Sequence, residues 1–425
     1  MILPRSSCLI LAGACLLGGL LPVSADDVVG INDPIHQYWT ATPRDRFSRL
    51  KAALAAGEKE LDTTSELGFL ESLLEALEVP VSSQMLVFSV TSLQKNLISP
   101  RRPRALYFSD DTYVGYVPGG QIEVISLDPD LGGIFYIFDD FRPGRRPHME
   151  RSDDCMRCHS PRHMDGIPGL VIESVVPGIT GGGEKAFRRE ITGHGIPLDL
   201  RFGGWHVTGA PASLKHWGNL MMIYDDNGRV ERPIKPGELF DFRRYPRATS
   251  DVLPHLLHEH QVGFVNRALQ ASYRARVLLK SPGAPEVGQE LDALALDLAK
   301  YLLFADEAAL PGEGLMGDAE FKTAFASARK PGPGGASLRD LDLKSRLLAH
   351  RCSYMIYSPA FAGLQPELKS RIYRILDSAL SADAPADFAY LPVAERETIR
   401  GILKATLPEL PAEWGAAADS RLSRR

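Results

Sequence analysis

The sequence has little cysteine, no excess of basic charge and no long apolar run beyond its first residues. Its 425 residues include 48 lysines and arginines against 53 aspartates and glutamates, a formal net charge of −5. Without a basic excess the chain has no electrostatic source of affinity for nucleic acid, and we expect no nucleic-acid partner. Five cysteines in a chain of this length also exclude a small scaffold held together by disulfides.

The apolar stretch that approaches the length of a membrane span lies at the extreme N-terminus. Arg5 precedes an apolar run from Cys8 to Leu21, and Val23-Ser24-Ala25 ends it with small residues where signal peptidase reads the chain. The run is shorter than the roughly 20 residues of a spanning helix. Residues 1–25 are therefore predicted to be a signal peptide, with an uncleaved anchor as the alternative. Cleavage would leave a periplasmic or otherwise exported protein without an integral membrane span.

The rest of the chain is predicted to form an α+β fold in three regions and a loose tail. Residues 26–140 combine helical spacing over 42–77, capped by Thr42, with a small antiparallel sheet. Residues 141–248 are rich in loops, residues 249–407 are helical, and residues 408–425 form the tail. The predicted strands span 85–90, 105–108, 113–117, 122–125 and 134–138, and the predicted C-terminal helices span 251–280, 286–304, 341–357, 367–380 and 394–403.

The loop-rich region contains Cys155-Met156-Arg157-Cys158-His159, the CxxCH pattern of c-type haem attachment. Two thiols three residues apart can add to the two vinyl groups of one haem, and the next residue places an imidazole on the iron. The spacing explains all three residues at once, so Cys155, Cys158 and His159 are predicted to hold one covalent haem c. Export agrees with this prediction, because haem is attached outside the cytoplasm.

Two other uses of the paired cysteines are weaker. A zinc ribbon needs a second pair of ligands, and after signal cleavage only Cys352 remains besides the motif. A thioredoxin-like dithiol needs a strand-to-helix context, whereas Asp153-Asp154 before the motif and Pro161 after it favour a loop and a short helix.

The sequence leaves the sixth iron ligand open. Met164 is too close to His159 for the chain to wrap the porphyrin edge easily. His260 lies on the inward face of the predicted helix 251–280. Its predicted role is that of an iron ligand or a distal-pocket residue, and the alternative is a hydrogen-bonded core histidine. His216 is a comparable candidate for the distal side. Further candidates are Met221, Met222 and His206. Alternation along the chain with Trp205 and Val207 predicts that the His206 side chain faces outward. The remaining alternative is an open sixth position on the iron.

Several segments of the mature chain carry a likeness to a known group of proteins, namely 81–85, 106–108, 113–119, the CxxCH motif, 167–171, 203–205, 216–219, 259–261 and 353–358. With these segments the chain resembles a group of exported bacterial single-haem proteins described as cytochrome c domain proteins. The resemblance implies haem attachment at Cys155 and Cys158 and iron ligation by His159, and it implies no particular reaction. The chain differs from the small class of cytochromes c, because its haem motif follows a predicted β region.

These observations predict a redox role in two alternative forms. The first is an electron-transfer protein with a six-coordinate haem, whose partner is a redox protein or a small-molecule donor or acceptor. The second is a peroxidase-like haem oxidoreductase with an open iron site and a distal acid–base group such as His260 or His216. A haem-based sensor is a third and weaker alternative.

Overall fold

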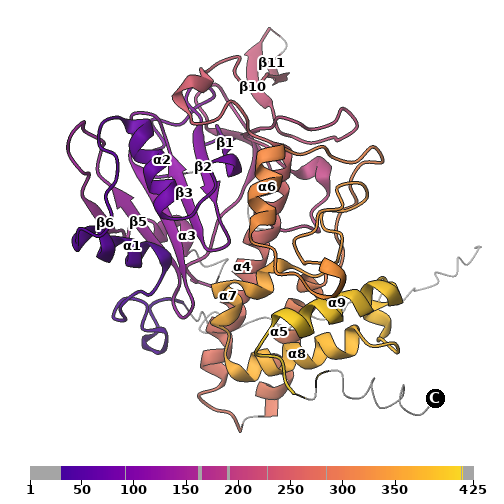
Figure 1. The fold of residues 1–425 in the computed structure, drawn as a ribbon. Helices are drawn as coiled ribbons and strands as arrows, with labels where there is room; N and C mark the ends of the chain where they lie inside the picture. The colour runs from indigo at the N-terminus through magenta and orange to yellow at the C-terminus, as the bar shows by residue number, and fades with distance from the viewer. Residues whose placement is uncertain are drawn as a thin grey trace, which may run out of the picture.

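The computed structural model describes residues 30–90, 92–160, 165–188, 192–226, 228–283, 285–412 and 414. The predicted signal peptide 1–25 and Met164 lie outside these residues. The described chain combines helices with antiparallel sheets, which confirms the predicted α+β class (Figure 1).

A seven-stranded antiparallel sheet forms the N-terminal half, in the order β6-β5-β4-β3-β2-β1-β9. The five predicted strands all occur, with ends shifted by a few residues. Because β6 and β9 complete this sheet, it extends across the predicted boundary at residue 140. Two hairpins, β7–β8 and β10–β11, stand apart from it. The strands are β1 (Met85–Val87), β2 (Arg104–Phe108), β3 (Thr112–Tyr116), β4 (Ile122–Asp128), β5 (Gly132–Phe138), β6 (Met149–Arg151), β7 (Ser174–Pro177), β8 (Gly183–Arg188), β9 (Trp205–His206), β10 (Leu220–Asp225) and β11 (Gly228–Pro233).

One face of the large sheet is covered by two amphipathic helices. Phe47 of α1 packs on Tyr136 and Phe138 of β5, with ring centroids 4.3 and 5.6 Å apart. Phe69 of α2 meets Phe138 at 5.5 Å. The other face is covered by α4, which leads into a C-terminal group in which α5 packs against α8. The helices are α1 (Arg46–Ala55), α2 (Glu66–Ala76), α3 (Met156–His159), α4 (Val252–Leu278), α5 (Pro285–Leu302), α6 (Ala319–Ser327), α7 (Pro359–Ala362), α8 (Pro366–Ala379) and α9 (Val393–Thr406).

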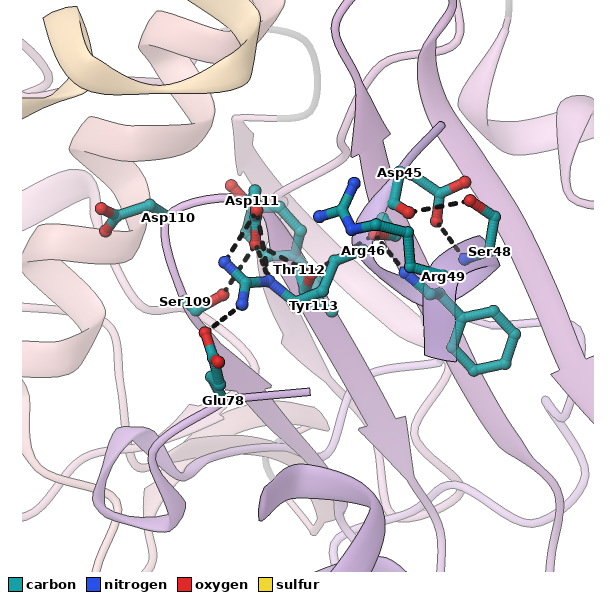
Figure 2. A network of polar contacts seen from close by, with 12 residues as sticks. Asp45, Arg46, Ser48, Arg49, Glu78, Ser109, Asp110, Asp111, Thr112 and Tyr113 are labelled. Atoms are coloured by element: carbon teal, nitrogen blue, oxygen red, sulfur yellow. Dashed lines mark hydrogen bonds and ion pairs between the residues drawn. The ribbon is translucent and has the colours of Figure 1, made fainter. Parts of the chain in front are cut away.

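An ion-pair network ties α1 to the turn between β2 and β3 (Figure 2). The Arg46 guanidinium donates to both carboxylate oxygens of Asp111, at 2.9 and 3.1 Å, and also pairs with Glu78. Ser109 and Thr112 donate hydroxyl hydrogens to the same Asp111. Because Asp111 is buried, these donors compensate for the loss of hydration of its charge.

The structure corrects the predicted start of the first helix. The predicted helical stretch 42–77 contains two helices, and the first begins after Asp45 instead of Thr42. The Asp45 carboxylate accepts the Ser48 N–H at 3.0 Å, which is the usual N-cap bond.

The predicted helix 341–357 is wrong for most of its length. Residues 341–353 form turns, and only a 3-10 helix over Tyr354–Tyr357 remains. The Asp342 carboxylate accepts the N–H groups of Ser345 and Arg346, and the Arg346 guanidinium donates to two carbonyls just after it. Such bonds from side chain to backbone compete with helical ones. Cys352 is buried in this non-helical stretch.

Within the described ranges, no helix combines the length and apolar character that crossing a membrane requires.

Candidate functional site

The CxxCH motif forms a single helical turn on the sheet face opposite α1 and α2. Cys155 occupies the N-cap position of α3, and its carbonyl accepts the N–H groups of Cys158 and His159 at 3.2 and 3.0 Å. Residues three and four apart in a helix share a face, so the turn gathers both sulfurs and the imidazole on one side. Both thiols are free, with Cys158 exposed and Cys155 partly buried.

The imidazole of His159 is oriented by the segment that follows it. Its Nδ1 lies 2.9 Å from the Gly169 carbonyl oxygen. A carbonyl only accepts hydrogen bonds, so Nδ1 carries the proton and the lone pair is left on Nε2. Burial lowers the pKa of His159 to about 4, against the opposing effect of the Gly169 hydrogen bond. The side chain is therefore a neutral imidazole at neutral pH, the form that binds a metal.

The sheet beside His159 offers a partly open surface that combines apolar side chains with one ion pair. The His159 ring packs on Phe135 of β5 at a centroid distance of 4.6 Å. On the same face, the pairings place Leu106, Gly115, Glu123 and Ile137 in one row across β2 to β5. Leu106 and Ile137 are only partly buried, and so is Ile125 in the next row. Gly115 adds no side chain to this surface, and the Arg104 guanidinium lies over it.

An ion pair on that surface lies within electrostatic reach of the motif. Arg104 and Glu123 pair across β3, with their side chains 12% and 14% exposed. Both charges influence the pKa values of Cys155 and His159. For Cys155, burial is the largest effect and raises the thiol pKa. A reactive redox dithiol normally has a lowered thiol pKa, so this environment favours a neutral thiol and disfavours the thioredoxin-like alternative.

These features fit a covalent haem with His159 as its proximal ligand. The two thiols are available on one face, the Nε2 lone pair is available, and Phe135 and the partly buried Leu106 and Ile137 supply apolar surface beside the Arg104–Glu123 pair. A haem needs no cluster of protein ligands. Among the described residues, no group of three or more His, Cys, Asp or Glu side chains gathers as a metal site.

His260 points inward from α4, as its helical position predicts, and both of its ring nitrogens are hydrogen-bonded. Its Nδ1 lies 2.7 Å from His194 Nδ1, and its Nε2 lies 2.7 Å from the Ser353 hydroxyl. His194 Nε2 lies 3.2 Å from the Ala305 carbonyl oxygen, which can only accept, so His194 donates to Ala305 through Nε2. His260 Nδ1 therefore donates to His194 Nδ1, and the Ser353 hydroxyl donates to His260 Nε2. This is the bonding of a core histidine. Ligation of iron by His260 Nε2 would require Ser353 to be displaced, and the distal assignment of His260 stays a prediction.

The two other histidine candidates have aromatic neighbours. His216 lies edge-on to Phe202 at 5.8 Å, and its buried Nδ1 has no hydrogen-bond partner in the described chain. The expectation that His206 faces outward is wrong, because its side chain is fully buried between Phe88 and Phe240. Both sides of β9 are covered, so alternation along the strand does not separate a core side from a solvent side. Met221 and Met222 are also buried.

A cavity of about 530 Å³ lies at the C-terminal end of α5. Its lining includes Ala305, whose carbonyl accepts the hydrogen bond from His194 Nε2, and Glu307. Burial raises the pKa of Glu307 to about 7. Phe304 and Asp306 adopt left-handed backbone angles there, with φ of 56° and 60°. Sequence reasoning missed this cavity, because its residues follow no motif and come from separate segments.

Sequence reasoning also missed the two residues that contact the His159 ring, Gly169 and Phe135, and it missed Asn266, which bonds to the backbone of Leu170. Gly169 lies in the segment 167–171 that carries the family resemblance, and that string was the available indication. Comparison of the chain with protein-family models, with curated proteins and with solved structures gave no match.

Proposed function

We propose that the protein is an exported c-type cytochrome with one covalent haem c that acts in electron transfer. Cys155 and Cys158 would hold the haem by thioether bonds, and His159 would bind the iron through Nε2. In each attachment the sulfur bonds to one vinyl carbon and the thiol proton goes to the other. When bound, the haem iron supplies one-electron redox chemistry.

The observation that carries this proposal is the hydrogen bond from His159 Nδ1 to the Gly169 carbonyl. Histidines that bind metals commonly donate their second ring N–H to a carbonyl or carboxylate, which sets the tautomer and the ring orientation. A histidine beside a redox dithiol does not need its Nε2 directed in this way. The raised thiol pKa of Cys155 is further support.

Haem attachment is tested by producing the protein with its export signal in a host that matures c-type cytochromes. We expect the wild-type protein to carry a haem-staining band on a denaturing gel, and the Cys155→Ala, Cys158→Ala double variant to lose it. Cys352→Ala is the matched control, because Cys352 is the remaining cysteine of the described chain and lies buried away from the motif. This control keeps the band. Haem staining in the double variant would contradict covalent attachment through these thiols.

The redox role is tested by the optical spectrum of the haem-loaded protein, oxidised and reduced, with and without carbon monoxide. Electron transfer predicts a low-spin spectrum that carbon monoxide does not change, since a filled sixth position excludes added ligands. A high-spin ferric spectrum with ready carbon monoxide binding would overturn the electron-transfer role in favour of the peroxidase-like alternative.

A further inference from the structure

The loop that accepts the His159 proton is held by a residue far away in the sequence. The Asn266 side chain, on α4, forms two hydrogen bonds with the backbone of Leu170, each 2.8 Å long. Its Oδ1 accepts the Leu170 N–H, and its Nδ2 donates to the Leu170 carbonyl. A side-chain amide carries the acceptor and the donors that this pairing needs.

This pair lies one residue from the carbonyl that orients His159. Gly169 precedes Leu170, its carbonyl accepts from His159 Nδ1, and its own N–H donates to the His159 carbonyl at 2.9 Å. On the other side, the Pro168 carbonyl accepts the Gly133 N–H of β5 at 3.1 Å. The loop is therefore attached to the sheet, to α3 and to α4 through three successive residues.

We propose that Asn266 is a positioning residue for the iron ligand. By holding Leu170 at two points, it keeps the Gly169 carbonyl where it accepts the Nδ1 proton, and so sets the orientation and basicity of His159 Nε2. This inference rests on the proposed function, because it concerns the histidine that would bind the haem iron.

The electronic consequence has a definite direction. A hydrogen bond donated by Nδ1 increases the electron density at Nε2, and a more basic ligand stabilises ferric over ferrous iron. Loosening the acceptor should therefore raise the reduction potential. Loss of a partner of this kind typically changes metal affinity 10- to 100-fold. A tenfold change in the preference for ferric iron corresponds to a rise of about 59 mV for a one-electron couple.

The test compares the midpoint potentials of haem-loaded wild-type protein and Asn266→Leu, a variant of similar size without either hydrogen bond. Gln270→Leu is the matched control, because Gln270 is also partly buried and lies one turn further along α4. We expect a rise of about 59 mV or more in Asn266→Leu, no shift in Gln270→Leu, and haem staining in all three proteins.

The remaining outcomes also decide the proposal. Equal potentials in wild type and Asn266→Leu, with the haem attached in both, would overturn the positioning role while leaving the proposed function intact. A wild-type protein without covalent haem would overturn both. If Asn266→Leu does not fold, Asn266→Ala provides the measurement, since alanine fits the helix and leaves space for water at Leu170. A potential that is unchanged in this smaller variant would equally overturn the role.

Discussion

The buried histidine His206 gives a quantitative test of the fold, in the variant His206→Phe. Its ring lies 4.5 Å from Phe88 and 4.8 Å from Phe240, measured between centroids. Neither ring nitrogen has a hydrogen-bond partner among the residues described. Burial, with a smaller contribution from His255, lowers the pKa of His206 from 6.5 to about 3. The folded protein therefore holds this side chain neutral over a range in which the unfolded chain binds a proton.

The sign and size of the pH effect follow from that difference. Below pH 6.5 the unfolded state binds more protons than the folded state, so stability falls as the pH falls, until the folded-state pKa near 3 is reached. Between about pH 7 and about pH 5, one such histidine costs about 2 kcal/mol of unfolding free energy. Phenylalanine keeps the aromatic packing and removes the titrating group, so His206→Phe should lose about 2 kcal/mol less than wild type over this interval. At neutral pH the variant should be equally stable or about 1 kcal/mol more stable, because two unbonded polar nitrogens are no longer buried.

Urea denaturation followed by circular dichroism at both pH values measures this difference. Phe88→Leu is the control, since it loosens the same cluster without removing a titrating group and should lower stability equally at both pH values. The reasoning is refuted if His206→Phe and wild type lose the same free energy on acidification. The haem spectrum of the variant should match that of wild type, and loss of the sixth ligand would instead assign His206 to the iron.

Three further substitutions test the sheet surface, a buried ion pair and a tight backbone contact. Gly115→Val puts a side chain where the Arg104 guanidinium lies, so it should displace the Arg104–Glu123 pair beside His159 and lower the haem-to-protein ratio about tenfold without changing the far-ultraviolet circular dichroism; a wild-type ratio would show that haem attachment does not depend on this pair. Arg201 and Glu259 form an ion pair whose two side chains are 2% and 4% exposed. Arg201→Met removes the cation and should lower the free energy of unfolding by about 3–5 kcal/mol in urea denaturation, and adding Glu259→Gln should restore part of that loss. Losses that simply add in the double variant would contradict coupling between the two residues. Gly363→Ala places a Cβ atom 1.6 Å from a backbone carbonyl oxygen of Pro129 and should lower stability by about 1–3 kcal/mol or more, seen as a reduced melting temperature; an unchanged melting temperature would contradict this contact.

The local elements of this protein could be predicted from its sequence. Alternating apolar residues indicated the strands from β1 to β5, and apolar residues three and four apart indicated α4, α5, α8 and α9, because these repeats match the periods of a strand and a helix. The CxxCH spacing likewise predicts a haem attachment motif, since it places two thiols and an imidazole within one helical turn. The failure at 341–357 has a local cause as well, because the Asp342 and Arg346 side chains form the backbone bonds that a helix would have used.

The surroundings of the motif depended on the tertiary structure. The acceptor for His159 lies 10 residues further along the chain, and the residue that holds this loop, Asn266, lies 96 residues beyond Leu170. The burial of His206 and the partners of His260 also come from segments distant in sequence. A hydropathy pattern shows which face of an element is buried, but the identity of the atoms opposite that face depends on how the elements pack. The sequence by itself therefore determined the local elements and the motif that supplies candidate ligands, whereas packing decided which hydrogen bonds orient His159 and which histidines lack a partner among the described residues.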